Sequence, residues 1–146
     1  MGEVSCTGVH GSNQLASASL LECLVWDINA GKDATCETAD NNYFPEIWPW
    51  KQGHEDFDPA LIAQDWLTIK NTMWNYVGLI RTRDCMLQAR TILRHLQSEE
   101  EQFYQQAIMT REILELRNGV QTALSVIAAT LESRESRGPH YVSEGE

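Results

Sequence analysis

Apolar residues recur three and four positions apart along four stretches of the chain, which is the spacing of amphipathic helices. The stretches are residues 19–29, residues 59–81, residues 84–106 and the residues from Thr110 to the Gly138-Pro139 stop signal. Asp58 is expected to cap the second helix, with Pro59 at its first position, and Thr110 is expected to cap the fourth. The last three helices have short links, which predicts an up-down bundle.

The predicted fold class is therefore mainly α, with a three-helix up-down bundle in residues 59–146. Residues 1–30 form a separate loop and helix, and residues 31–58 connect the two parts. Such a long connector without periodicity is unusual inside a compact domain. Its aromatic and proline-rich piece, Phe44–Trp50, is expected to be a loop pinned by its own tryptophans onto a neighbouring face. A peptide-binding platform is the alternative.

The loop before the first helix contains three glycines, Gly2, Gly8 and Gly11, which permit turns and close approach to a ligand. Ser19 and Glu22 fit a capping box, in which the two side chains satisfy free amides at the start of the helix. Such a helix start directs amides and a positive dipole end toward an electron-rich ligand. A helix cap without any ligand is the alternative.

Composition excludes several classes of protein. The 146 residues carry a formal net charge of −10, which argues against nucleic acid and against an anionic membrane surface as partners. No apolar run approaches the roughly 18 residues of a membrane span, and the N-terminal residues lack the basic start of a signal peptide. Histidines and cysteines show no metal-binding spacing, so no metal is expected. Reduced thiols in the cytoplasm are the preferred interpretation, with disulfides as the alternative.

Four blocks of sequence carry a resemblance to a known family. They are residues 2–22, which include Thr7-Gly8-Val9-His10-Gly11 and Ser19-Leu20-Leu21-Glu22, then Met73–Arg81, Leu114–Asn118 and Glu135–Tyr141. In this order they resemble the C-terminal portion of the fumarate reductase/succinate dehydrogenase flavoprotein superfamily, and within it the L-aspartate oxidase family. The resemblance implies that residues 1–30 are the last part of an FAD-binding domain and that the bundle is the C-terminal helical domain.

The resemblance also implies roles for individual residues. Glu3 matches the acid that hydrogen-bonds the ribityl chain of FAD, and the amides of Ser19 and Leu20 match the pair that meets the isoalloxazine ring. His10 matches a histidine beside the substrate, and Gln14 stands where the family has an arginine that binds a substrate carboxylate. A glutamine offers that carboxylate only a neutral amide. Ala18 likewise stands where the family usually has asparagine.

The implied reaction is FAD-dependent oxidation of L-aspartate to iminoaspartate, in de novo NAD biosynthesis. The family's catalytic arginine belongs to a capping domain, so no catalytic residue is assigned within this chain. No Gly-x-Gly-x-x-Gly fingerprint occurs in the 146 residues, so the chain is expected to be a C-terminal fragment that neither binds FAD nor turns over substrate alone. The alternative is a helical interaction module, or a subunit that docks on a separately encoded flavin domain or a full-length flavoprotein.

Two pairs of charged residues in the bundle admit a second interpretation. Arg117 with Glu115, and Arg137 with Glu135, have the residue types of catalytic acid–base pairs. The preferred interpretation is structural: in the family the helical domain packs on the flavin domain, and such residues stabilise that contact.

Overall fold

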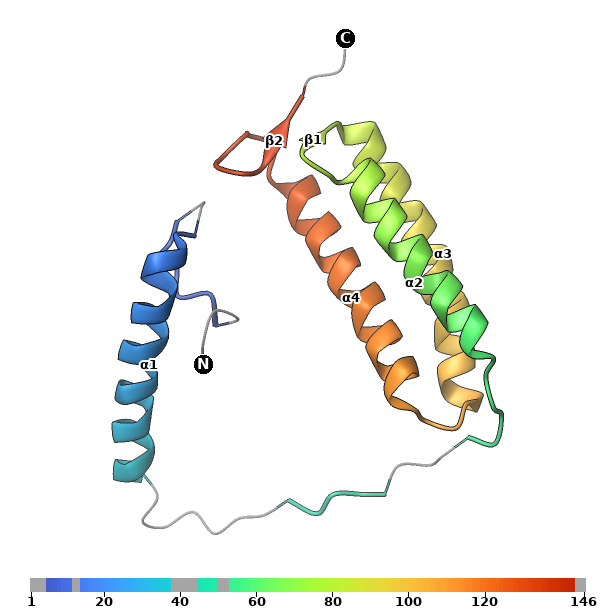
Figure 1. Ribbon diagram of the computed structural model, residues 1–146, viewed down its shortest axis with the longest axis horizontal. Coiled ribbons are helices and arrows are strands. Elements are labelled where there is room, and N and C mark those ends of the chain that lie inside the picture. The colour runs from blue at the N-terminus through green and yellow to red at the C-terminus, as the bar shows by residue number, and fades with distance from the viewer. Residues whose placement is uncertain (1–4, 12–13, 38–44, 50–52, 144–146) are drawn as a thin grey trace. The chain divides into compact units, whose positions relative to one another are not determined.

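The computed structural model describes residues 5–11, 14–37, 45–49 and 53–143 (Figure 1). The chain divides into two compact units, residues 1–49 and residues 50–146. The first unit contains helix α1 (Ala16–Glu37), and the second contains helices α2 (Pro59–Tyr76), α3 (Arg83–Gln106) and α4 (Arg111–Glu132) with the short strands β1 (Ile80–Arg81) and β2 (Tyr141–Val142). The predicted mainly α fold is confirmed.

Helix α1 begins earlier and ends later than the sequence pattern predicts. The carbonyl of Leu15 accepts hydrogen bonds from the N–H groups of Ala18 and Ser19 at 3.0 and 3.2 Å, so the first turn forms before Ser19. The predicted capping box is therefore wrong, because Ser19 already lies inside the helix. Residues 31–37, which were expected in the connector, continue the helix to Glu37. Gly31 does not interrupt it.

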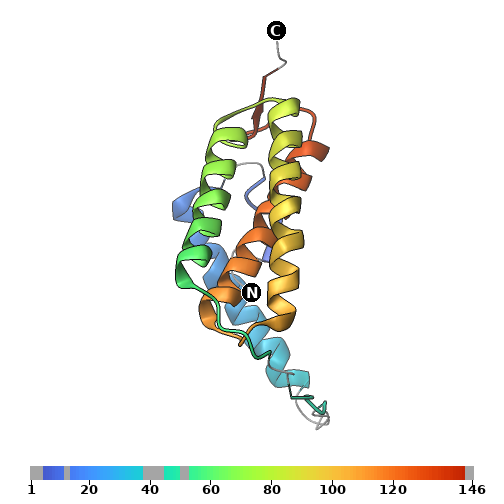
Figure 2. The ribbon, with the colours of Figure 1, turned by 90° about the vertical axis from the view of Figure 1, so that its right-hand side faces the viewer.

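The second unit is a three-helix up-down bundle, as predicted (Figure 2). Asp58 caps α2 and accepts a hydrogen bond from the N–H of Ala60 at 2.8 Å, and Thr110 caps α4 through the N–H of Ile113. Thr82 caps α3 in the same way through the N–H of Cys85. All three caps are side-chain acceptors two or three residues from the amides that they bind, which is why the sequence reveals such sites.

Helix α2 ends at Tyr76, whereas its apolar stripe predicted an end at Arg81. Residues 80–81 instead pair in parallel with residues 141–142, with Ile80 opposite Tyr141 and Arg81 opposite Val142. The side chain of Arg81 folds back, and its Nε–H donates to the carbonyls of Val77 and Gly78. These carbonyls lie at the C-terminal end of α2, where a cation is favourable.

The core of the bundle lies between its three helices, and Leu93, Val120 and Ile127 are its largest fully buried side chains. Trp66 of α2 packs directly on Gly119 of α4, where an added Cβ would lie 2.7 Å from the indole ring. Other buried members of the core are Ile69, Val77, Ala89, Leu96, Leu116 and Ala123.

The segment before α2 is held on the loop between α3 and α4. The N–H groups of His54 and Glu55 donate to the carbonyl of Gln106, and the N–H of Ile108 donates back to Glu55. The aromatic piece of the connector behaves differently from the prediction: Trp48 is 78% exposed and is not pinned onto a face. Phe44 and Trp50 lie outside the described residues.

Candidate functional site

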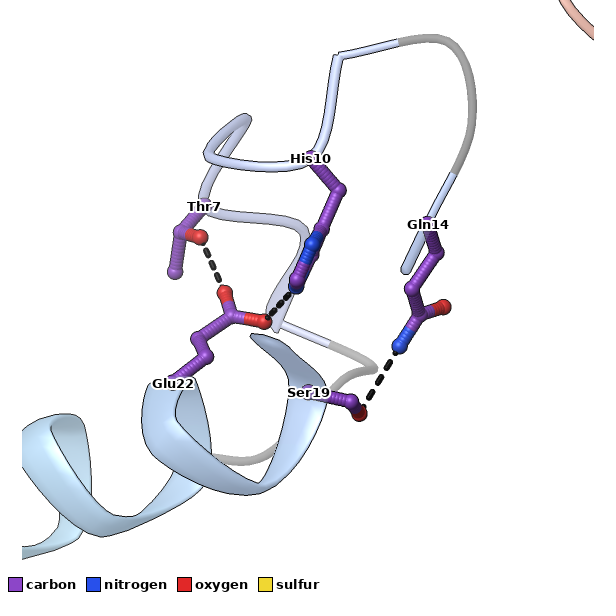
Figure 3. Close-up of polar contacts among 5 residues, drawn as sticks. All are labelled: Thr7, His10, Gln14, Ser19 and Glu22. Atoms are coloured by element: carbon purple, nitrogen blue, oxygen red, sulfur yellow. Dashed lines mark hydrogen bonds and ion pairs between the residues drawn. The ribbon is translucent and has the colours of Figure 1, made fainter. Parts of the chain in front are cut away.

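The candidate site is the loop of residues 5–11 together with the first two turns of α1, and Glu22 lies at its centre (Figure 3). The hydroxyl of Thr7 donates to one oxygen of the Glu22 carboxylate. Nε2 of His10 lies 2.5 Å from the other oxygen. The side chain of Glu22 is only 5% exposed, so its two partners replace most of the water around it.

Two glycines bring Thr7 and His10 back toward the helix. Gly8 and Gly11 have φ angles of 81° and 59°, which lie in the left-handed region that other residues rarely adopt. The N–H of Gly11 donates to the carbonyl of Gly8 at 3.2 Å and closes the turn between them. The backbone conformation of this turn therefore accounts for the two glycines, whether or not a ligand binds here.

The contacts to Glu22 also determine its charge. Hydrogen bonds from Thr7 and then from His10 lower the pKa of the Glu22 carboxyl below its usual value, because both stabilise the ionised form. The carboxylate is therefore the form that holds the loop at neutral pH. An ionised carboxylate can only accept hydrogen bonds, so both partners must act as donors.

Gln14 and Ser19 form a second link between the loop and the helix. The side-chain amide of Gln14 donates to the Ser19 hydroxyl at 2.9 Å (Figure 3). The structure therefore places three of the predicted site residues, His10, Gln14 and Ser19, around the start of α1. Leu20 is 78% exposed on the same turn. Glu3 lies outside the described residues.

A different set of contacts joins two of the sequence blocks at one end of the bundle. A guanidinium nitrogen of Arg81 lies 2.7 Å from Nδ1 of His140, and Nε2 of His140 lies 2.9 Å from the carbonyl of Ser133. Because arginine only donates, Nδ1 accepts, and Nε2 carries the proton that is donated to the Ser133 carbonyl. The blocks Met73–Arg81 and Glu135–Tyr141 thus meet through their side chains and through the strand pair.

The predicted charged pairs are partly rearranged. Arg137 and Glu135 do pair, at 2.7 Å, but both are exposed. Arg117 does not pair with Glu115: it lies 3.4 Å from Glu101 and over the ring of Tyr104. Glu115 pairs with Arg111 one turn away, at 2.7 Å. Within the described ranges, no group of three potential metal ligands is found.

A family model described as "Fumarate reductase flavoprotein C-term" matches residues 66–145, which include most of the bundle and both strands. The chain belongs to this family. Its curated relatives include L-aspartate oxidases from Acinetobacter baylyi, 35% identical over 143 residues, and from Yersinia pestis, 36% identical over 143 residues. Both alignments cover 97% of this chain but only 26% and 27% of the relatives. The chain thus spans about a quarter of their length.

An archaeal relative extends the same comparison. The L-aspartate oxidase of Halobacterium salinarum is 34% identical over 145 residues, which is 99% of this chain and 28% of the relative. The similarity therefore includes the loop and α1, which lie outside the family model, as well as the bundle. None of the described helices combines the length and the apolar character that a membrane span requires.

The start of α1 fits the electron-rich edge of a flavin in one respect and differs in another. No acidic residue lies in its first turn, so the positive end of the helix dipole is not neutralised there. However, the N–H of Ser19 already donates to Leu15 and is not a free helix-end amide. The specific flavin contacts of Glu3, Ser19 and Leu20 stay predictions.

The partners of Glu22 differ from the helix amides that the capping-box pattern predicts. The signal lay in the loop, where a threonine and a histidine flank Gly8 and precede Gly11. Glu100 lies in an acidic run, residues 99–101, that carries no sequence signal for burial. Glu100 is only 3% exposed, and its Oε1 has no hydrogen-bond partner among the residues that are described.

Proposed function

We propose that this chain forms the C-terminal part of an L-aspartate oxidase, which oxidises L-aspartate to iminoaspartate with FAD in de novo NAD biosynthesis. The observation that carries the proposal is the alignment of 97% of the chain with proteins named L-aspartate oxidase, at 33–36% identity. The position of His10 beside the start of α1 supports it, whereas Gln14 departs from the family's arginine.

In this proposal the loop and α1 orient substrate and cofactor. His10 and Gln14 are assigned to the substrate, and Ser19, Leu20 and Glu3 to the flavin, as the family resemblance implies. The chemistry that FAD supplies when bound is acceptance of a hydride from the substrate. The chain's own contribution is the positive end of α1 and the polar groups of the loop that Glu22 holds.

The 146 residues do not complete such a site. They contain neither the Gly-x-Gly-x-x-Gly fingerprint nor a residue that can be matched to the capping domain's arginine. Most contacts to the diphosphate and adenosine of FAD come from that fingerprint. We therefore propose that these residues bind FAD and act on aspartate only together with the remaining three quarters of the relatives' length.

The bundle provides a surface for that association. Trp74, Leu79 and Ile80 are 74%, 81% and 71% exposed, and Tyr141 opposite Ile80 is half-exposed. Ile80 and Tyr141 are partners in the strand pair, and neighbouring exposed apolar side chains occur at contact surfaces between domains or proteins. The second candidate function is that the chain is a subunit docking on a separate flavin domain, which is favoured because the bundle has a core of its own.

A chimera tests the proposal. The matching quarter of the Pseudomonas aeruginosa L-aspartate oxidase, 36% identical to this chain, is replaced by these 146 residues. We expect the purified chimera to retain flavin. Its kcat/KM for aspartate should lie roughly two to four orders of magnitude below the parent, because loss of one partner of a desolvated charge pair costs roughly 3–5 kcal/mol.

The Gln14→Arg variant of the chimera is the matched control. It should recover most of the lost kcat/KM at unchanged flavin content, because the guanidinium of an arginine can form two parallel hydrogen bonds to the substrate carboxylate. A chimera that folds, by circular dichroism, yet carries no flavin would contradict the proposed function.

A further inference from the structure

His10 is the one ionisable base near the start of α1. Between Gly2 and Gly31 the sequence contains no lysine or arginine, and Gln14 supplies a neutral amide. That amide is, moreover, hydrogen-bonded to Ser19. If this segment binds the carboxylate of a substrate, as the proposed function requires, the only side chain of the segment that can meet it with positive charge is His10.

Glu22 determines which atom of His10 is available for this task. The carboxylate contacts Nε2 at 2.5 Å, and the side chains of His10 and Glu22 are 17% and 5% exposed. Because the carboxylate only accepts, Nε2 must carry a proton. Within the described part of the loop and α1, no hydrogen bond to Nδ1 is found. In the imidazolium form, Nδ1–H is then the charged donor left for a ligand.

The rest of the cluster makes this arrangement rigid. Thr7 donates to the second oxygen of Glu22, so the carboxylate is fixed at both ends. The turn between Gly8 and Gly11, both with left-handed backbone, brings His10 within reach of the Glu22 carboxylate. An orienting carboxylate behind a histidine determines both the ring orientation and the protonated nitrogen, as outer partners of histidine ligands do in other sites.

We propose that Glu22 is the positioning residue that holds His10 so that Nδ1–H donates to a carboxylate of the dicarboxylic substrate. Glu22 does not touch the substrate. This inference rests on the proposed function, and it adds to it the specific ring atom and the residue that selects it.

The first experiment measures the ring directly in the full chain. Long-range ¹H–¹⁵N spectra of the histidines report which nitrogen of His10 carries the proton when the ring is neutral. We expect the Nε2–H form in the natural chain and a mixture of both forms in Glu22→Gln. Asp27→Asn, which changes an exposed acid on α1 that does not contact His10, should keep the Nε2–H form.

The second experiment measures ligand binding in the flavin-loaded chimera, with succinate as an unreactive dicarboxylate and the flavin absorbance as the signal. Glu22→Gln should raise the Kd for succinate by about tenfold to a hundredfold, the range expected for losing an oriented hydrogen bond to a charged group. Asp27→Asn should stay within about twofold, and the flavin content of both variants should match the parent.

The outcomes separate this proposal from the proposed function. A His10 ring whose protonated nitrogen is unaffected by Glu22→Gln contradicts the positioning role. So does a Kd for succinate that is the same in the flavin-loaded chimera and in its Glu22→Gln variant. A folded chimera without flavin contradicts the proposed function itself, and with it the ligand assigned to His10.

Discussion

Arg81 and His140 lie 59 residues apart in the sequence and are joined by a hydrogen bond of 2.7 Å. The same guanidinium donates through Nε to two carbonyls at the end of α2. His140 in turn donates through Nε2 to the carbonyl of Ser133, which follows α4 directly. One side chain therefore connects the ends of two helices with the β1–β2 pair.

Replacing Arg81 by lysine keeps the charge but removes the planar fork. We expect Arg81→Lys to lower the free energy of unfolding of the bundle by about 1–3 kcal/mol, since it loses several hydrogen bonds to a charged group. Urea denaturation followed by circular dichroism measures this. Arg90→Lys, at an exposed position on α3, is the control and should change stability by less than about 0.5 kcal/mol. Equal urea midpoints for Arg81→Lys and Arg90→Lys would show that the hydrogen bonds of Arg81 contribute nothing to the stability of the bundle.

Glu100 makes the stability of the bundle depend on pH. Burial raises the pKa of its carboxyl to about 7, with Asp65 and Glu101 adding to the rise and Arg117 opposing it. Between about pH 4.5 and 7 the unfolded chain releases this proton while the folded bundle retains it, so stability falls as pH rises through this range. Above about pH 7 the loss is complete.

The test is the Glu100→Gln variant, which keeps the shape of the side chain and removes its proton equilibrium. Urea unfolding between pH 5 and pH 8 should show a flatter pH dependence for this variant, and higher stability than the natural chain at pH 8. The slope removed is at most about 1.4 kcal/mol per pH unit, and less where solvent screens the charge. Glu132→Gln, at an exposed position on α4, should leave the profile unchanged. A Glu100→Gln profile parallel to the natural one would refute the assignment.

Gly119 is required by the indole of Trp66. Alanine at Gly119 would place its Cβ 2.7 Å from the ring, whereas at Gly31 of α1 a Cβ meets nothing within 4 Å. We expect Gly119→Ala to destabilise the bundle by up to about 2 kcal/mol, because a steric penalty of about 1–3 kcal/mol is offset by a gain in helix propensity of about 1 kcal/mol. In a Trp66→Leu background the same substitution should become neutral or stabilising. An unchanged penalty in that background would place the cause elsewhere.

Hydrogen exchange should distinguish the two units. Leu20, Leu24 and Ile28 of α1 are 78%, 57% and 49% exposed, whereas Val120 and Ile127 of α4 are fully buried. A helix that buries little apolar area opens at low free-energy cost. We expect amides in residues 20–28 of the 146-residue chain to exchange much faster than those in residues 120–131. Equal protection of the two segments would mean that they open as one cooperative unit.

The helices of the bundle and two of their caps follow from the order of residues alone. Apolar spacing, Asp58 and Thr110 act over one to four positions, and the interactions that they predict are completed within the same turn of helix. The presence of a glycine loop before a helix could be predicted on the same local basis, and with it the neighbourhood of His10, Gln14 and Ser19.

The partners of individual charged groups depended on where the folded chain brought distant segments together. Glu22 had amides available nearby, yet it pairs with Thr7 and His10 because two left-handed glycines turn the loop back over the helix. The apolar stripe predicted that Arg81 lies at the end of α2, but Arg81 lies in β1 instead. Its backbone pairs with residues 141–142, and its side chain bonds to His140. Glu100 lay in an acidic run, and packing of α3 against α2 and α4 buried it. Hydrogen bonds and burial between distant residues leave no fixed spacing in a sequence, so only the folded chain reveals them.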